Sequence, residues 1–527
     1  MTIIDIEAGL QPFPAQEGLA KAEIPAESPS RRSASKERDV NQEKEKDRKE
    51  LDWDGPEDPD NPNNWNFSTK AFHTALPALY CFVIVIGTSI YVPAIPYIQA
   101  IWHVQHEVAV LPLSMYTLGL AVGPIITAPL SEIYGRRPVY LVSLILLMVF
   151  MAGASQAENI QTLIICRFFA GAGGSSPLAV GGGTVADIWG QGTKSGPAGL
   201  LFIMAPFLGT AFGTVAFSLT TLQNRLNRIG FLTGAYIIAD FDANWRWSLY
   251  VVLIVAAPFV LISYFMKETS KRQILLSRRT QRCTAAPVLP IRLRLSSIHD
   301  SVRLGITRPL SMLFTEPLVS YLSIYTGFAF AMVFSFFGSY AYVYANVYRF
   351  NARQIGLCFL GLVPGFLLAV TTFGILDATL YRKAKVELNG RPAPEHRLYA
   401  AMLGSLMLPI ALFWFAWSAR SGVHWIVPVL AGLPFGWGNL MIFLSAITYL
   451  TDVYGAESGA SAIAANGILR YLFGAAFPLF TTQMYDKLGI PWSGSVFAFI
   501  SVAMMPIPWL FFVYGPKLRM RSSFETS

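Results

Sequence analysis

Apolar runs of about 20 residues recur along the chain from residue 73 onward, and they constrain its fold more than any other feature. A helix of about 20 apolar residues crosses a hydrocarbon core of about 30 Å. Composition agrees, because 53% of the residues are hydrophobic and only 14% are charged, too little polar surface for a soluble protein of 527 residues. The sequence therefore predicts an all-α integral membrane protein with twelve transmembrane helices, near residues 73–96, 108–128, 139–157, 161–185, 196–217, 247–266, 318–345, 354–375, 398–418, 424–448, 457–482 and 493–515.

The basic residues divide these spans into two sets of six and indicate their orientation. The largest polar interruption, residues 267–308, is rich in Arg and Lys, and the connection 376–397 is also basic. Short basic loops lie in the cytosol by the positive-inside rule, and an even number of spans then puts both termini there. We interpret the net charge of +8 as a topology signal and not as a surface for nucleic acid. The expected parts are a disordered cytosolic N-terminal tail (1–70), an N-terminal six-helix half (71–266), a basic cytosolic linker (267–308), a C-terminal six-helix half (309–515) and a cytosolic C-terminal tail (516–527).

The loop after the second predicted span changes abruptly from apolar to charged residues. Residues 131–137 read SEIYGRR, and Glu132 precedes Arg136 by one helical turn, so the two can meet across the helix end. A bare Arg-Arg pair in a short loop can also be a topology anchor and nothing more. The wider stretch resembles the signature loop of the major facilitator superfamily, Gly-x-x-x-Asp-x-x-Gly-Arg-Arg, with Ala128 in place of the first Gly and Glu132 in place of the Asp. This resemblance implies the major facilitator fold and a latch between parts of a transporter.

The fourth predicted span contains an arginine, which is costly inside an apolar helix and normally faces the protein interior or water. Arg167 lies a turn or two from the start of the span, so it can alternatively extend to the outer interface. The run RFFAGAGGSSPL, followed by Asp187 near the cytosolic end, is similar to the twelve-span drug:proton antiporter family, in which this arginine is tied to proton coupling. Asp187 is in place to pair with Arg136 or Arg137. The expected gate network is Glu132, Gly135, Arg136, Arg137 and Asp187.

The fifth predicted span begins like the Gly-x-x-x-Gly-Pro helix of that antiporter family, where small residues allow close helix approach. A polar segment, residues 214–231, then interrupts the span at Gly213. Joining Gly213 directly to Leu232 would restore a family-like helix and outer loop, so the segment is either a retained intron or a longer external loop. Across the fourth and fifth spans the expected helix-packing residues are Gly171, Gly174, Pro177, Gly209 and Gly213.

Polar residues in the tenth and eleventh spans are candidates for a substrate cavity. Asn439 sits beside two glycines deep in its span, where it either lines a cavity or makes a helix-to-helix hydrogen bond. Asn466 and Arg470 are one turn apart and share a helix face. Arg470 is near the middle of its span, which favours an inward, functional role. The expected cavity residues are Tyr91, Asn439, Asn466 and Arg470.

The motifs that are missing also limit the function. The sequence has no Walker-type phosphate loop, no HExxH or GxSxG motif and no paired Cys-His pattern, so we expect neither an enzyme nor a bound cofactor or metal. The resemblance implies a multi-pass transporter of the cell membrane that exports small amphipathic drugs, toxins or fungal secondary metabolites in exchange for protons. The alternatives are transport of polyamines or another small solute, and a non-transporting receptor on the same fold. The expected partners are a small-molecule substrate, protons and the lipid bilayer, without nucleic acid, and the chain is expected to act as a monomer.

A first prediction concerns the segment 214–231. Its length is no objection, because doubling the length of a loop costs only about 0.6 kcal/mol. The placement of the segment is an objection, because it would add Arg225 and Arg228 to an external loop, against the positive-inside rule. We expect messenger RNA from the source cells to lack the segment and the shortened protein to be the active form. Sequencing of transcripts tests this. Transcripts that mostly retain the segment, together with full transport by the long protein, would contradict it.

Overall fold

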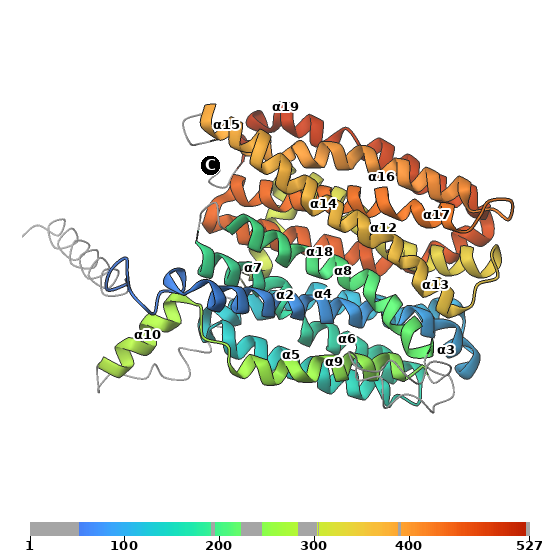
Figure 1. The fold of residues 1–527 in the computed structure, drawn as a ribbon, viewed down its shortest axis with the longest axis horizontal. Helices are drawn as coiled ribbons and strands as arrows, with labels where there is room; N and C mark the ends of the chain where they lie inside the picture. The colour runs from blue at the N-terminus through green and yellow to red at the C-terminus, as the bar shows by residue number, and fades with distance from the viewer. Residues whose placement is uncertain are drawn as a thin grey trace, which may run out of the picture. The chain divides into compact units, whose positions relative to one another are not determined.

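The computed structural model describes residues 52–190, 195–222, 245–282, 303, 305–387 and 392–522, and these residues form helices, turns and loops without a β-strand. Gly55–Ser527 makes one compact unit. The long helices of this unit run roughly parallel to one another (Figure 1). The all-helical membrane fold predicted from the sequence is therefore confirmed.

The first half of the unit contains six spans, two of which are interrupted. The first is broken between Ser89 and Ile95, and the fourth at Ser175, where Pro177 follows within the first turn of the next helix. The helices are α2 (Phe67–Ser89) with α3 (Ile95–Trp102), α4 (His106–Tyr134), α5 (Arg136–Ser155), α6 (Ile160–Gly174) with α7 (Ser176–Trp189), α8 (Ser195–Leu222) and α9 (Trp247–Tyr264).

The second half also contains six spans, but its first span is unbroken and its second is divided. Its helices are α12 (Pro317–Asn346), α13 (Ala352–Cys358) continued by η4 (Phe359–Leu362) and α14 (Val363–Leu376), a π-helical turn η5 (Asp377–Tyr381), α15 (Arg382–Glu387), η6 (Pro394–Leu398), α16 (Tyr399–Ser418), α17 (Ile426–Leu430), α18 (Gly432–Met504) and α19 (Ile507–Arg519).

Helix α18 is broken into three pieces, of which the third, after Gly489, needs α19 to reach the length of a membrane span. A straight helix of its 73 residues would be about 110 Å long, several times the thickness of a bilayer. Gly455 (φ 60°) and Gly489 (φ 74°) have left-handed backbone conformations that break it. Among the described residues, eleven helices are long and apolar enough to cross a membrane, and the last of them, Ser458–Arg519, contains the break at Gly489. It therefore holds two spans, which completes the predicted twelve.

The ordered unit begins earlier than the predicted tail of residues 1–70 allows. Asn66 caps α2 by accepting a hydrogen bond from the Thr69 N–H at 2.9 Å. Upstream, Asp58 is only 5% exposed and accepts from Arg278 Nη1 at 2.7 Å. Arg278 belongs to α10 (Lys271–Arg282), in the predicted linker, and the hydrogen bonds that it donates to Asp58 and Asp60 raise its pKa above the usual range. The segment before the first span is therefore attached to the linker, an attachment that its polar composition did not indicate.

Glycines set the closest helix–helix approaches in the first half. A Cβ atom at Gly171 of α6 would collide with the backbone of Tyr116 in α4. A Cβ at Gly209 of α8 would lie 2.7 Å from the Phe82 carbonyl oxygen of α2, and one at Gly213 would collide with Ser89. At Gly174 of α6 a Cβ would meet Leu147 of α5 at 3.0 Å. All four glycines thus lie where two helix backbones or a backbone and a side chain nearly touch.

Helix α8 does not end at Gly213. It continues to Leu222, and Thr214 and Val215, the first residues of the questioned segment, are buried. The structure therefore assigns the start of that segment to the helix, and residues 223–231 lie outside the described part of the chain. Whether transcripts keep the segment remains a prediction.

The packing predicts that α8 will not tolerate a methyl group at Gly209. Gly209→Ala places a carbon too close to the Phe82 carbonyl, and overpacking of this kind costs about 1–3 kcal/mol. Gly199→Ala is the matched control, because a Cβ on that residue of the same helix meets nothing within 4 Å. In thermal unfolding of the detergent-purified protein, we expect a lower midpoint for Gly209→Ala only. Equal midpoints for the two variants would show that α2 and α8 can separate without cost.

Candidate functional site

A carboxylate holds the loop between α4 and α5. Gly135 has φ 98°, a conformation that favours glycine, and a Cβ there would collide with Glu268. The two N–H groups that open α5 donate to Glu268, from Arg136 at 2.8 Å and from Arg137 at 3.2 Å. The first N–H groups of a helix lack partners within the helix, and an anion there is stabilised by the helix dipole. Glu268, which follows α9, therefore fixes the start of α5.

The side chains of the two loop arginines point to different partners. Arg136 Nε lies 3.3 Å from Asp187 Oδ2 at the end of α7, and its Nη1 donates to Ser131 Oγ at 2.9 Å. Arg137 donates to the Tyr264 carbonyl oxygen at 2.8 Å and lies over the Tyr264 ring. Of the two pairings left open by the sequence, Arg136–Asp187 is therefore the one formed. The expected contact between Glu132 and Arg136 is not among the described interactions of either residue, and Glu132 is exposed.

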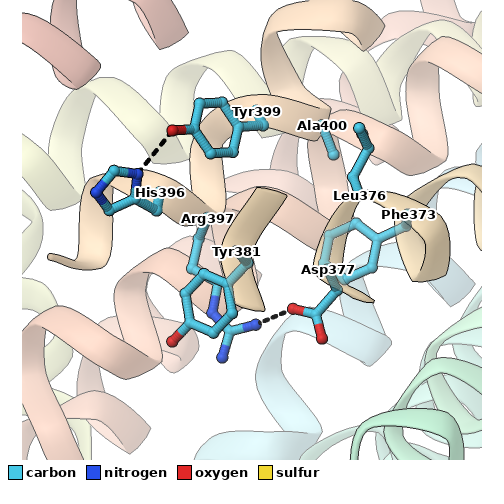
Figure 2. Close-up of a pocket in the computed structure, with 8 residues that line it drawn as sticks. All are labelled: Phe373, Leu376, Asp377, Tyr381, His396, Arg397, Tyr399 and Ala400. Carbon is cyan, nitrogen blue, oxygen red and sulfur yellow. Dashed lines mark hydrogen bonds and ion pairs between the residues drawn. The ribbon is translucent and has the colours of Figure 1, made fainter. Parts of the chain in front are cut away.

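A second charged cluster occupies the corresponding place in the second half. Arg397, at the end of η6, lies 2.7 Å from Asp452 and 2.5 Å from Asp377, with its guanidinium 3.7 Å from the centre of the Tyr381 ring. Figure 2 shows Arg397 and Asp377 turned toward each other from two helices. Arg136 and Asp187 are 51 positions apart, and Arg397 and Asp452 are 55 apart. Sequence analysis missed this cluster, although a comparison of these spacings between the halves would have signalled it.

The pocket in Figure 2 is formed around this cluster. Besides the ion pair, His396 Nδ1 lies 2.7 Å from the Tyr399 hydroxyl, and Phe373 and Leu376 supply apolar wall. Its charged groups pair with one another, and it contains none of the four expected cavity residues. We therefore regard it as part of the structure at the helix ends and not as a substrate site.

Arg167 is fully buried. Its exposed fraction is 0%, so the alternative in which it extends to the interface does not hold in this structure. The guanidinium carbon lies 4.4 Å from the centre of the Tyr116 ring and 5.0 Å from that of Tyr91, and Nη1 donates to the Gly87 carbonyl at 2.6 Å. Its Nε and Nη2 are buried without a hydrogen-bond partner among the described residues. The expected cavity residue Tyr91 is also fully buried, with its hydroxyl donating to Ala109 at 2.8 Å.

The three remaining cavity candidates surround α12. Asn439 donates to the Ala329 carbonyl, which is the helix-to-helix alternative of the two left open for it. Asn466 donates to Thr326 Oγ1 at 2.6 Å, while its Oδ1 is buried without a partner among the described residues. Arg470 is partly exposed, and its guanidinium carbon lies 4.5 Å from the Phe443 ring centre. Arg470 is thus the candidate with a polar group still accessible.

The two halves are hydrogen-bonded directly at the end of α4 that is farthest from the Gly135 loop. His106 Nε2 lies 3.1 Å from Thr482 Oγ1, and Glu107 accepts from Gln483. Helix α4 has 29 residues, so its two ends are about 43 Å apart. At the other end, the Arg136 and Arg397 clusters each join helices of a single half. Among the described residues, the hydrogen bonds between the halves thus lie at one end of α4, and the ion pairs at its other end lie within each half, an asymmetry expected of a carrier closed on one side.

Twelve spans in two matching halves, with polar side chains at their junction, define a multi-span membrane transporter. The chain matches the profile of the Major Facilitator Superfamily over residues 78–478 and belongs to that family.

Named relatives cover most of the chain. It is 37% identical over 506 residues to Polyamine transporter 4 of Saccharomyces cerevisiae, covering 91% of this chain and 73% of the relative. It is 36% identical to the multidrug transporter mdrA of Aspergillus fumigatus, covering 89% and 74%. It is 34% identical to the citrinin biosynthesis cluster transporter ctnC of Monascus purpureus, covering 90% and 92%. The solved proton:xylose symporter XylE shares the fold with a TM-score of 0.58 at 14% identity, covering 85% of this chain and 97% of XylE.

A pair of variants tests which carboxylate holds the loop. Glu268→Gln removes the charge at the start of α5, and we expect it to destabilise the protein by about 1–2 kcal/mol, the upper range for an anion at a helix N-terminus. Glu132→Gln removes an equal charge from an exposed position nearby and should leave the stability unchanged. The unfolding midpoint of both purified variants at pH 7 gives the comparison. If Glu132→Gln lowered the unfolding midpoint more than Glu268→Gln does, Glu132 would be the carboxylate that holds the loop.

Proposed function

We propose that this chain is a proton-coupled secondary active transporter that exports small amphipathic molecules by alternating access. The observation that carries the proposal is the pattern of hydrogen bonds and ion pairs. Those of His106 with Thr482 and of Glu107 with Gln483 join the halves at one end, and charged clusters lie within each half at the other. A carrier that rocks about a central site needs such an asymmetry, reversed in the second state. Export is favoured because mdrA and ctnC are named as a multidrug transporter and as a transporter of a biosynthetic cluster.

The gate is proposed to consist of Glu132, Gly135, Arg136, Arg137 and Asp187, with Glu268 added as the acceptor for the loop backbone. The Arg136–Asp187 pair joins α5 to α7, so a change in either group alters the free energy of the state in which the pair forms. Arg167 is proposed to act in proton coupling through its charge, since a guanidinium does not release its proton at physiological pH. The exchanged proton would then bind a carboxylate near the gate.

The transporter is proposed to reside in the cell membrane as a monomer with both termini in the cytosol. The positive-inside rule supports this orientation, because the end of the bundle that carries Arg136, Arg397 and the basic helix α10 would then face the cytosol. Family membership argues against an enzymatic role.

Polyamine transport is the second candidate, and it rests on the similarity to Polyamine transporter 4. A receptor on the same fold is a third, and would be distinguished by the absence of any flux.

Energy coupling gives the test of the proposed function. Cells that express the full chain should accumulate less of at least one of three probes, 1-naphthaleneacetate, 1-naphthaleneacetamide and spermidine, than cells with an empty vector. A protonophore should abolish this difference at unchanged nucleotide levels, because the chain has no nucleotide-binding motif and depends on the proton gradient. The vector control corrects for the redistribution of weak acids that a protonophore causes by itself. A difference that survives the protonophore would exclude proton coupling.

A further inference from the structure

Away from the helix ends and breaks, the charged side chains of the described spans have one sign. Two arginines, Arg167 and Arg470, lie away from the helix ends. In the spans that the structure describes, Asp and Glu occur only in the end turns or beside a helix break, at Glu107, Glu132, Asp187, Asp377, Glu387, Glu395, Asp452 and Asp486. Neither guanidinium is therefore matched by a carboxylate at its own depth in the described spans. A charge in the membrane interior without a counter-charge is costly, which points to a partner that binds and dissociates.

Arg470 lies where that partner could reach it. Its guanidinium carbon is 4.5 Å from the Phe443 ring centre, 4.8 Å from that of Tyr471 and 5.2 Å from that of Phe330. Phe443 in turn packs against Phe207 of α8 at 5.1 Å, and α8 belongs to the other half. Arg470 is partly exposed at this junction, whereas Arg167 is fully buried. Of the two, Arg470 is the cation that faces the path between the halves.

The residues around Arg470 add the other features of a recognition site. Its Nε is buried without a hydrogen-bond partner among the described residues. One turn earlier on the same face, Asn466 offers a buried Oδ1 that likewise lacks a donor there. A guanidinium donates to a carboxylate or phenolate oxygen, and an amide oxygen accepts from a hydroxyl or N–H group. The rings of Phe330 and Phe443 provide apolar and aromatic surface beside these polar groups.

We propose that the substrate bound at Arg470 is an amphipathic organic anion, with a carboxylate or phenolate that pairs with the guanidinium and an apolar body against the surrounding rings. The inference rests on the proposed function and specifies its substrate by charge. It separates the two candidates, because a polyamine would meet two like charges and, in the described spans, no carboxylate at their depth. The donor that satisfies Asn466 Oδ1 would be a hydroxyl or N–H on the same molecule.

Equilibrium binding to the purified full chain in nanodiscs at pH 7 tests this. The probes are 1-naphthaleneacetate, its neutral analogue 1-naphthaleneacetamide, and spermidine as competitor. We expect the acid to bind about tenfold or more tightly than the amide, as a single charge-assisted hydrogen bond allows, and spermidine not to displace it. Arg470→Gln should bring the ratio of the two affinities to about one while leaving the amide affinity unchanged. Arg470→Lys should keep part of the preference.

Lys487→Gln is the matched control, since it removes one positive charge from an exposed position near the end of the same helical segment. It should keep the wild-type ratio. The proposal is overturned if spermidine binds more tightly than the acid, if the acid does not bind at all, or if Arg470→Gln and Arg470→Lys both keep the wild-type ratio. The binding experiment applies no proton gradient, so a failure to find the preference for the anion does not contradict proton-driven export. Conversely, a flux that is insensitive to the protonophore does not contradict the preference for the anion.

Discussion

The bilayer interior offers no water to hydrogen-bond, and the rest of the structure follows from that constraint. Every described span is helical, and many hydroxyls inside the spans donate back to carbonyls of their own helix, as Thr117 does to Leu113 and Ser339 to Ser335, both at 2.9 Å. Most of the buried polar atoms without a partner among the described residues are hydroxyls, but three of the side chains carry a guanidinium or an amide group. Arg167, Asn466 and Arg470 each retain a buried polar atom without a partner among the described residues.

The same constraint moves the acidic groups to the helix ends, where they organise the loops. In the first half Glu268 accepts the opening N–H groups of α5, and Asp187 pairs with Arg136. In the second half Arg519, at the end of α19, lies 3.0 Å from Glu395 of η6, and Asp452 pairs with Arg397. In each half, these contacts join the start of the third span to the ends of the fourth and sixth spans. Two halves braced internally in this way can move against each other as rigid bodies.

The spans, their number and their grouping could be predicted because a stretch of about 20 apolar residues has few other folds available. The pairing of Arg136 or Arg137 with Asp187 was also within reach, since a family resemblance supplied the helix order. Glu132 shows where prediction failed: its spacing from Arg136 allowed a local contact, but an exposed carboxylate gains little from one. Glu268 binds the loop instead, because it accepts from backbone N–H groups that have no partner within the helix. No local sequence pattern connects Glu268 to Arg136, which is 132 positions away. The sequence left two placements open for Asn439 and two for Arg167, and only the packing of the folded helices decides between them.

The unmatched arginines also affect how the carrier responds to voltage. One elementary charge moved across 100 mV corresponds to about 2.3 kcal/mol. An empty site that contains Arg470 carries its positive charge through any change of access, whereas a site that holds an anion is closer to neutral. The membrane potential would then act mainly on the return of the carrier without substrate, and less on the step that moves the substrate. Turnover would depend on voltage even where substrate affinity does not.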